Sequence, residues 1–471
     1  MRSRALHLFA VCCGLLTTTW SSPAAGEEGD VDGSQGLTLP ELEERALAHY
    51  PEIEAAEAEV DRLEAALGEV RWQPLSGVRV QGTLSPTPER RGDAVHYAQG
   101  DLVYIDIPWG VLVRTQLDVS IPIYTFGRLG AERDAARADI DEGREKVRAK
   151  RRWVIAQVRR AYDALQLSKQ STSLLEEGRG YIERAQRYID RSLDEDTGDI
   201  TEGDRLQVEV LSAEVEARLA DARRGSRLAT AALRMLAGLE GDEGDSGIAT
   251  PTLEPIEIEL GPLRRHLDMA LESRPEVAAA AARTTAAQAG RRAARARFFP
   301  EIRFVGDIDY AYSNVGDDQL SPFAYDPFNH FRIEFGLALR WDLDFMSDRA
   351  RFHQAVATLR EAEAEEEVVT SRVSLEVEEA YIEVEENQNI VAARRRGRRA
   401  SRGWLISIMQ GIDVGVLEPP ELVDALRAYF EQSFLYLEAV VHLNASIGQL
   451  DLAVGAEGDR GAAAAEGGGD E

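Results

Sequence analysis

The chain has 471 residues, of which 29% are charged and 7% aromatic, and its formal net charge at pH 7 is −29. So acidic a chain repels nucleic acid and anionic lipid, which excludes a DNA- or RNA-binding protein. The length allows two or three ordinary domains or one elongated one, and long stretches rich in Ala, Glu and Arg favour extended helices. The acidity itself fits either a solvated helical surface or a cation-favouring interior.

Residues 1–26 have the features of a secretory signal peptide. A basic start is followed by an apolar stretch over residues 5–16 and then by small residues up to Gly26. Both cysteines, Cys12 and Cys13, fall in this segment, so the mature chain is predicted to have neither a disulfide nor a thiol nucleophile. Lipidation of Cys12 is the alternative, although the residue before it is not small.

After residue 30 the sequence contains no run of 18 apolar residues, so no transmembrane helix is predicted. An exported protein of this kind is periplasmic, secreted, or a β-barrel of the outer membrane.

The sequence contains one unit twice. Short motifs recur in the same order: Ala46-Leu47 and Pro51-Glu52-Ile53 as Ala270-Leu271 and Pro275-Glu276-Val277, and Ala161-Tyr162 as Ala380-Tyr381. We therefore predict two structural repeats, over residues 37–240 and 261–451, joined by a linker over residues 241–260. A flexible N-terminus over 27–36 and a disordered Gly/Ala/Glu-rich tail over 452–471 are expected to flank them.

Each repeat begins with a predicted helix, over residues 38–71 in the first copy. Alternating apolar and polar residues then predict two strands, one from Val78 and one around Val113. A loop containing Pro86 and Pro88 is expected between these strands.

The second repeat alternates more strongly, with apolar residues of one parity from Phe331 to Phe345. This is long for a strand of a soluble protein and is typical of an outer-membrane strand with one face toward lipid. A soluble antiparallel sheet with one face on a core is the alternative. Several aromatic residues are candidates for girdles at the membrane interfaces: Tyr310, Tyr312, Phe323, Tyr325, Phe328 and Trp341.

A long helical hairpin is predicted after each strand pair, over 131–193 with 204–237 and over 348–410 with 419–448. Apolar residues in 4-3 spacing, such as Val154, indicate coiled-coil packing. At 1.5 Å per residue these helices extend on the order of 90–100 Å, so they must project from any compact domain.

Four strands cannot close a barrel, for which about eight is the practical minimum, and an open sheet edge is not tolerated in lipid. Three chains would together supply twelve strands, which leaves room for a lumen.

This organisation resembles the TolC-like outer-membrane efflux factor family. The resemblance spans roughly residues 37–450 and rests on the duplicated helix–strand–strand–long hairpin unit, the turn at 121–127 (IPIYTFG) and the hairpin return at 419–425 (PPELVDA). It implies a mixed, mainly α fold: a homotrimer with a 12-stranded outer-membrane β-barrel and a periplasmic α-helical coiled-coil tunnel. It also implies docking to a periplasmic adaptor, which couples the duct to an inner-membrane pump or ABC exporter, and it implies no cofactor.

The resemblance also implies site residues at the hairpin tips. Two acids that form rings at the periplasmic aperture in the family align with Glu421 and Asp424, and Asp204 matches the acid of a closing contact between helices. The simpler interpretation is that these are solvated acids in first helical turns, where the helix dipole favours them.

The hairpin turns depart from the family pattern. Ile412 and Leu417 stand where some members have the tyrosine and arginine that lock the closed tip. The second turn is apolar, and Val414, Val416 and Leu417 are its candidates for adaptor docking. The first turn, residues 194–199, faintly resembles a calcium loop, but its glycine is misplaced.

No catalytic or metal site is predicted. The seven histidines are scattered without ligand spacing, and Ser246 in the linker lacks the strand–turn–helix context of a nucleophile. The sequence thus predicts an export channel in the outer membrane rather than an enzyme. A periplasmic coiled-coil adaptor, an exported hydrolase and a structural protein without a pore are the alternatives, and the exported substrate is not determined.

Overall fold

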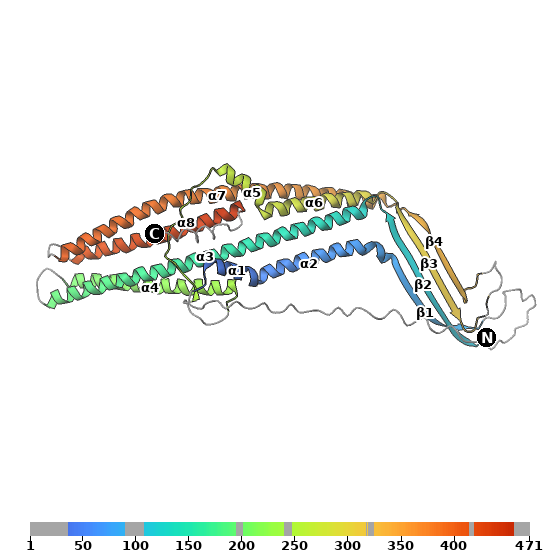
Figure 1. Cartoon of the computed structure of the whole chain (residues 1–471), viewed down its shortest axis with the longest axis horizontal. Helices are drawn as coiled ribbons and strands as arrows, with labels where there is room; N and C mark the ends of the chain where they lie inside the picture. The colour runs from blue at the N-terminus through green and yellow to red at the C-terminus, as the bar shows by residue number, and fades with distance from the viewer. Residues whose placement is uncertain are drawn as a thin grey trace, which may run out of the picture. The chain divides into compact units, whose positions relative to one another are not determined.

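The structure is a computed structural model, and it describes residues 36–89, 108–194, 201–239, 247–316, 318, 325–413 and 419–455. The chain divides into two units, Met1–Gly36 and Leu37–Glu471, and every element below belongs to the second (Figure 1). In chain order these elements are α1 (Leu39–His49), α2 (Pro51–Trp72), the 3₁₀ turn η1 (Gln73–Gly77), β1 (Val78–Pro88), β2 (Trp109–Tyr124), α3 (Arg128–Asp194), α4 (Glu202–Ala237), α5 (Leu263–Ser273), α6 (Pro275–Ala296), β3 (Glu301–Ser313), β4 (His330–Arg340), α7 (Phe345–Asp413) and α8 (Pro419–Val454).

The element order occurs twice, with matching lengths. The helices α1 and α5 each have 11 residues, α2 and α6 each have 22, and α4 and α8 each have 36. The two longest helices, α3 and α7, have 67 and 69 residues. The duplicated, mainly helical unit predicted from the sequence is confirmed.

The first helix of each repeat is broken, whereas the sequence predicted one continuous helix over 38–71. The break lies at Tyr50 (φ −75°, ψ 117°) and recurs at Arg274 (φ −68°, ψ 123°), each directly before a proline. The ring of Pro51 or Pro275 disfavours helical backbone at the preceding residue, while its own fixed φ suits the first position of the next helix.

The strands of both repeats form one antiparallel sheet in the order β1-β2-β3-β4. The β1 strand continues through Pro86 and Pro88, so the loop predicted at these two prolines is wrong. Within the described residues β1 is an edge strand. Pro86 and Pro88 have the same parity, so the backbone nitrogens of both, which carry no hydrogen, can lie on the unpaired side of β1.

The β4 strand ends at Arg340, although the alternation of apolar residues continues to Phe345. The amide of Asp348 donates to the carbonyl of Asp344 at 3.0 Å, so the first turn of α7 has already begun there. The last residue of the alternating run, Phe345, is therefore the first residue of α7 and not part of a strand.

The long helices pack in a row. Toward the hairpin tips α7 packs on α8, α8 on α3 and α3 on α4, while nearer the sheet the order is α2, α3, α6 and α7 (Figure 1). One apolar cluster combines residues near all four tip ends, among them Ile189, Val208, Ile408 and Val423. The tips of the two hairpins therefore lie at the same level. Within the described part of the chain, none of the helices is long and apolar enough to cross a bilayer.

Close packing of the two hairpins depends on Gly178 of α3. A Cβ atom at Gly178 would lie 2.6 Å from Cζ of the buried Phe430 on α8. We expect Gly178→Ala to destabilise the protein by about 1–2 kcal/mol, because overpacking outweighs the better helix propensity of alanine. At Gly180, two residues on, nothing lies within 4 Å of such a Cβ. Thermal denaturation should show Gly180→Ala as neutral or stabilising, and equal effects of the two changes would contradict the packing argument.

Candidate pore surfaces and aperture

One face of the sheet is apolar and exposed. The pairing register places Leu117 of β2 beside Ile308 of β3, and Ile308 beside Ile333 of β4. On this face Leu84, Phe335 and Leu337 are 74%, 76% and 72% exposed. The other members are Val78, Val80, Val111, Val113, Val119, Ile121, Phe304, Tyr310, Tyr312, Phe331 and Leu339. A soluble sheet would bury such a face on a core, whereas a membrane strand presents it to lipid.

The opposite face carries charged side chains in ion pairs. Asp309, only 4% exposed, lies 3.0 Å from Nε2 of His330, 3.4 Å from Nε of Arg114 and 3.8 Å from Nη2 of Arg332. Nη2 of Arg332 also lies 3.3 Å from Oδ1 of Asp307. Charges of this density belong on the water-filled side of a membrane sheet, so this face is suited to line a lumen.

Tyr325, a predicted member of an interfacial girdle, lies on the polar side. Nη2 of Arg114 donates to its hydroxyl at 3.3 Å, and its ring centre is 5.3 Å from that of His330. Tyr310 and Tyr312 do lie on the apolar face, 44% and 52% exposed. Phe323 lies outside the described residues.

The turn from β2 into α3 uses the sequence at 121–127. Phe126 (φ 52°) and Gly127 (φ 87°) both have left-handed backbone, which is costly for a residue with a bulky side chain. The ring of Phe126 compensates by stacking on Phe299 at 5.3 Å and by packing edge-on against Tyr124 at 4.8 Å. Aromatic side chains from both repeats therefore hold the junction between sheet and helices.

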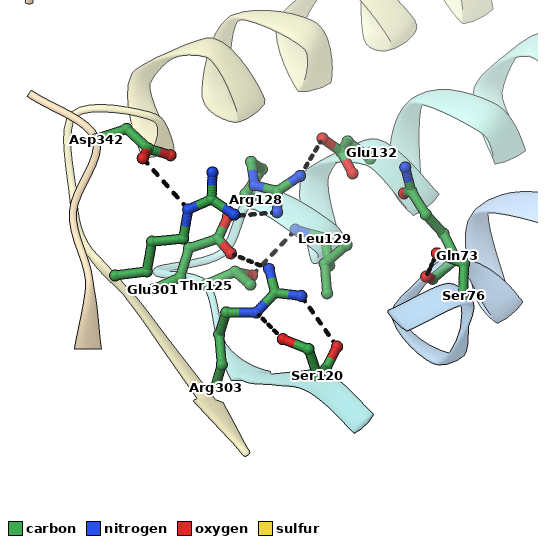
Figure 2. Close-up of polar contacts among 11 residues, drawn as sticks. Gln73, Ser76, Ser120, Thr125, Arg128, Leu129, Glu132, Glu301, Arg303 and Asp342 are labelled. Carbon is green, nitrogen blue, oxygen red and sulfur yellow. Dashed lines mark hydrogen bonds and ion pairs between the residues drawn. The ribbon is translucent and has the colours of Figure 1, made fainter. Parts of the chain in front are cut away.

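An ionic clamp joins the repeats at the same junction (Figure 2). Arg128 at the start of α3 contacts Glu301 of β3 at 2.6 Å and Glu132 of its own helix at 3.1 Å. Arg303 of β3 in turn donates to the hydroxyl and the carbonyl of Ser120 in β2, both at 3.0 Å. These contacts were not predicted from the sequence. The only feature of the local sequence that pointed to them is Arg128, which directly follows Gly127 of the turn.

Asp204 lies in the first turn of α4, at the tip of the first hairpin. Its Oδ2 accepts the backbone N–H and the hydroxyl of Thr201, each at 2.8 Å. This is a capping box, which satisfies backbone donors at the helix start. In a single copy the carboxylate of Asp204 is thus bound within its own hairpin.

Glu421 occupies the equivalent position of α8, two residues after the first, and Asp424 follows three residues later. Residues at this spacing share one helix face. Both are exposed, and among the described residues the ion-pair partner of Asp424 is Arg427, at a long 3.9 Å. Nothing in the described part of the copy covers these two acids, so they are available to face the axis of an assembly.

The docking candidates Val414, Val416 and Leu417 lie outside the described residues, as does most of the first hairpin turn. Within the described residues no three His, Cys, Asp or Glu side chains gather as metal ligands would.

The fold matches solved outer-membrane channels. The outer-membrane channel OprN shares 19% identity at a TM-score of 0.73, covering 89% of this chain and 90% of that chain. A membrane protein from Pseudomonas aeruginosa shares 20% at 0.72, covering 93% and 99%. The open state of the Neisseria gonorrhoeae MtrE outer membrane channel shares 20% at 0.71, covering 88% of both chains. No curated protein sequence matches.

The sequence itself matches the family described as outer membrane efflux protein, over residues 42–239 and 266–456. The two matched segments correspond to the two repeats, and together they cover well over half of the chain. The proteins of this family are channels rather than enzymes. The chain belongs to the outer membrane efflux protein family and is an exit duct of the outer membrane.

Proposed function

We propose that three copies of this chain form one export channel. The observation that carries this proposal is the four-stranded sheet, with its exposed apolar face, its charged face and its two edge strands β1 and β4. Open edges in a bilayer leave backbone N–H and C=O groups unsatisfied. Three copies joined β4 to β1 supply twelve strands, which close the sheet with the apolar face toward lipid and the charged face toward the lumen.

The helices extend the duct away from the membrane. At 1.5 Å per residue, α3 and α7 each span on the order of 100 Å. In the proposed assembly their tips meet a periplasmic adaptor through the second hairpin turn, with Val414, Val416 and Leu417 as contact residues. The adaptor couples the duct to an inner-membrane pump or ABC exporter, and that transporter selects the substrate.

The periplasmic aperture in this proposal is lined by Glu421 and Asp424. Threefold symmetry would place three copies of each carboxylate around the axis, giving two adjacent acidic rings. Their exposure and their shared helix face support this role. Asp204, which caps α4 at the same level, would support the rim from the neighbouring hairpin.

We expect the double change Glu421→Ala/Asp424→Ala to lower the cation-over-anion permeability ratio several-fold, since six carboxylates leave the narrowest part of the pore. The measurement is single-channel recording of the detergent-extracted protein in planar bilayers. Glu431→Ala is the matched control, because it removes an exposed acid two turns farther along the same helix. An unchanged permeability ratio in the double variant would mean that the narrowest part of the pore lies elsewhere. Lack of any conductance from wild type and both variants would contradict the channel.

A further inference from the structure

The helices α7 and α8 lie side by side (Figure 1), and a groove of about 480 Å³ opens between them. Glu386 on its wall is 27 positions before the end of α7 at Asp413, which puts the groove about 40 Å from the tip. It is therefore separate from the candidate aperture acids near the start of α8. Four residues of each helix line the groove: Ile382, Glu383, Glu386, Asn387, His442, Ala445, Ser446 and Gln449.

The two acids of the groove have no salt-bridge partner. Glu383 and Glu386 are exposed, and neither forms an ion pair with a described residue. Other acids of α7 do pair, as Glu365 does with Arg283 of α6 at 2.6 Å. The lining residues include no lysine or arginine. At a spacing of three positions, the two acids share one helix face, with Cβ atoms about 5–6 Å apart. The groove thus holds two separated negative charges that are not neutralised within the described part of the copy.

The other polar side chains of the groove offer hydrogen-bond acceptors. The hydroxyl of Ser446, only 3% exposed, donates to the carbonyl of Leu443 at 2.8 Å, so the lone pairs of its oxygen remain to accept. Nδ2 of Asn387 donates to the carbonyl of His442 at 3.4 Å, which leaves its Oδ1 to accept. Together with the two carboxylates, these oxygens suit a positively charged ligand that donates several hydrogen bonds.

The linker between the repeats covers the opposite face of the α7–α8 pair. Nε2 of Gln388 donates to the carbonyl of Ile258 at 3.1 Å, and Nδ2 of Asn444 donates to the carbonyl of Glu254 at 3.0 Å. At about 100° per residue, Gln388 points roughly 140–160° away from the two groove acids. A lumen has to stay open, so the face covered by the linker belongs on the outside of the proposed duct and the groove on the inside.

The fold does not require the polar groups of the groove, because the first repeat lacks them. The offset between the repeats is 219 positions for α3 and α7, as between Ala161 and Ala380. It is 217 positions for the equally long α4 and α8, which start at Glu202 and Pro419. In the first repeat the positions equivalent to Glu383, Glu386, His442 and Gln449 are therefore Ala164, Leu167, Gly225 and Ala232.

We propose that this groove binds a small organic polyamine, with Glu383 and Glu386 each contacting one of its ammonium groups. An ammonium group has three donors and no acceptor, which matches the oxygens of the groove. The methylene chain between two ammonium groups spans the distance between the carboxylates and can lie against Ile382 and Ala445. A bare metal ion fits less well, since no three His, Cys, Asp or Glu side chains gather as metal ligands in the described part of the chain.

The test uses the full-length protein extracted in detergent, with spermidine as the probe. Titration calorimetry should show one spermidine bound per chain. Glu383→Gln/Glu386→Gln should weaken this binding at least tenfold, because charge-assisted hydrogen bonds are lost at both carboxylates. The matched control is Glu378→Gln/Glu385→Gln, which removes two exposed acids of the same helix that do not line the groove. The control should change the affinity less than twofold.

Single-channel recording tests where the groove lies in the duct, a point that rests on the multi-copy channel proposed above. Spermidine should lower the conductance of the wild type. The spermidine concentration that gives half of this loss should rise at least tenfold in Glu383→Gln/Glu386→Gln and stay unchanged in the control variant.

The outcomes separate the groove from the channel. Equal losses of affinity in the two variants would overturn the groove and indicate a general attraction of an acidic chain for cations. A conducting protein that binds no spermidine would also overturn the groove and leave the channel standing. Binding with the expected variant pattern but no effect on open channels would overturn the position in the lumen. Intact binding by a protein that never conducts would contradict the channel and leave the groove.

Discussion

Replacing Phe335 with arginine should prevent or strongly weaken insertion of the protein into the outer membrane. Phe335 lies at the centre of β4 on the apolar face and is 76% exposed. An arginine facing lipid near the bilayer midplane costs about 2–4 kcal/mol in a membrane β-barrel. In the proposed trimer this cost falls on every copy. The yield of heat-resistant trimer in the membrane fraction and the denaturant midpoint in vesicles should both drop.

The neighbouring position supplies a matched control for that change. Gly336 points to the opposite, charged face, and a Cβ atom there meets nothing within 4 Å. Gly336→Arg therefore adds the same charge one residue away, on the side proposed to face water, and should cost less than about 1 kcal/mol. If both variants lost stability equally, the assignment of the two sheet faces would be wrong. If only Gly336→Arg failed, the faces would have to be exchanged.

The two faces of the sheet were predictable because side-chain direction in a strand is set locally, with a period of two. Phe331 through Leu339 and their charged neighbours therefore indicated the faces from sequence alone. The ends of elements were less predictable, since β4 ends at Arg340 although the alternation of apolar residues continues to Phe345, the first residue of α7. The break at Tyr50 has a local cause, the proline after it, and could have been predicted from that rule.

The polar contacts at the junction could not be predicted in the same way. Arg128 and Glu301 are 173 positions apart, and they meet only because β2 pairs with β3 in one particular register. The burial of Asp309 between Arg114 and His330 depends on three strands at once. Local patterning indicates which face a residue occupies but not its partner on the next strand.

At the tips, the structure adds a role for one candidate and leaves others as predictions. The capping box of Thr201 and Asp204 is a local signature that the sequence already contained. Exposure of Glu421 and Asp424 agrees with either an acidic ring or solvated helix starts, because such a ring would form only between copies. Val414, Val416 and Leu417 remain predictions for adaptor docking.

The second large effect is expected at Asp163, a half-buried carboxyl on α3, far along the helix from the membrane sheet. Burial raises the pKa of Asp163 to about 7, and the positive charge of Arg159 one turn away lowers it only in part. Glu43 contacts Nε of Arg159 at 2.6 Å, so the guanidinium of Arg159 is already paired and stabilises the carboxylate of Asp163 less.

The sign of the pH dependence follows from proton binding. An unfolded aspartate titrates near pH 4, so between about pH 4 and 7 the folded chain holds a proton that the unfolded chain has lost. The contribution of Asp163 to stability is therefore highest at pH 4 and falls as the pH rises to about 7. Above that pH a desolvated negative charge is retained in the fold, at a cost of roughly 2 kcal/mol after allowance for partial exposure.

Asp163→Asn keeps the shape of the side chain but cannot ionise. We expect its melting temperature to match that of the wild type near pH 4 and to exceed it by a few degrees at pH 8. Asp190→Asn removes an exposed carboxylate from the same helix and reports the effect of lost charge without burial. If the advantage of the Asp163 variant were the same at both pH values, its source would be packing or net charge. A growing advantage above pH 6 confined to Asp163→Asn would identify desolvation as the cause, because only a buried group gains by losing its charge.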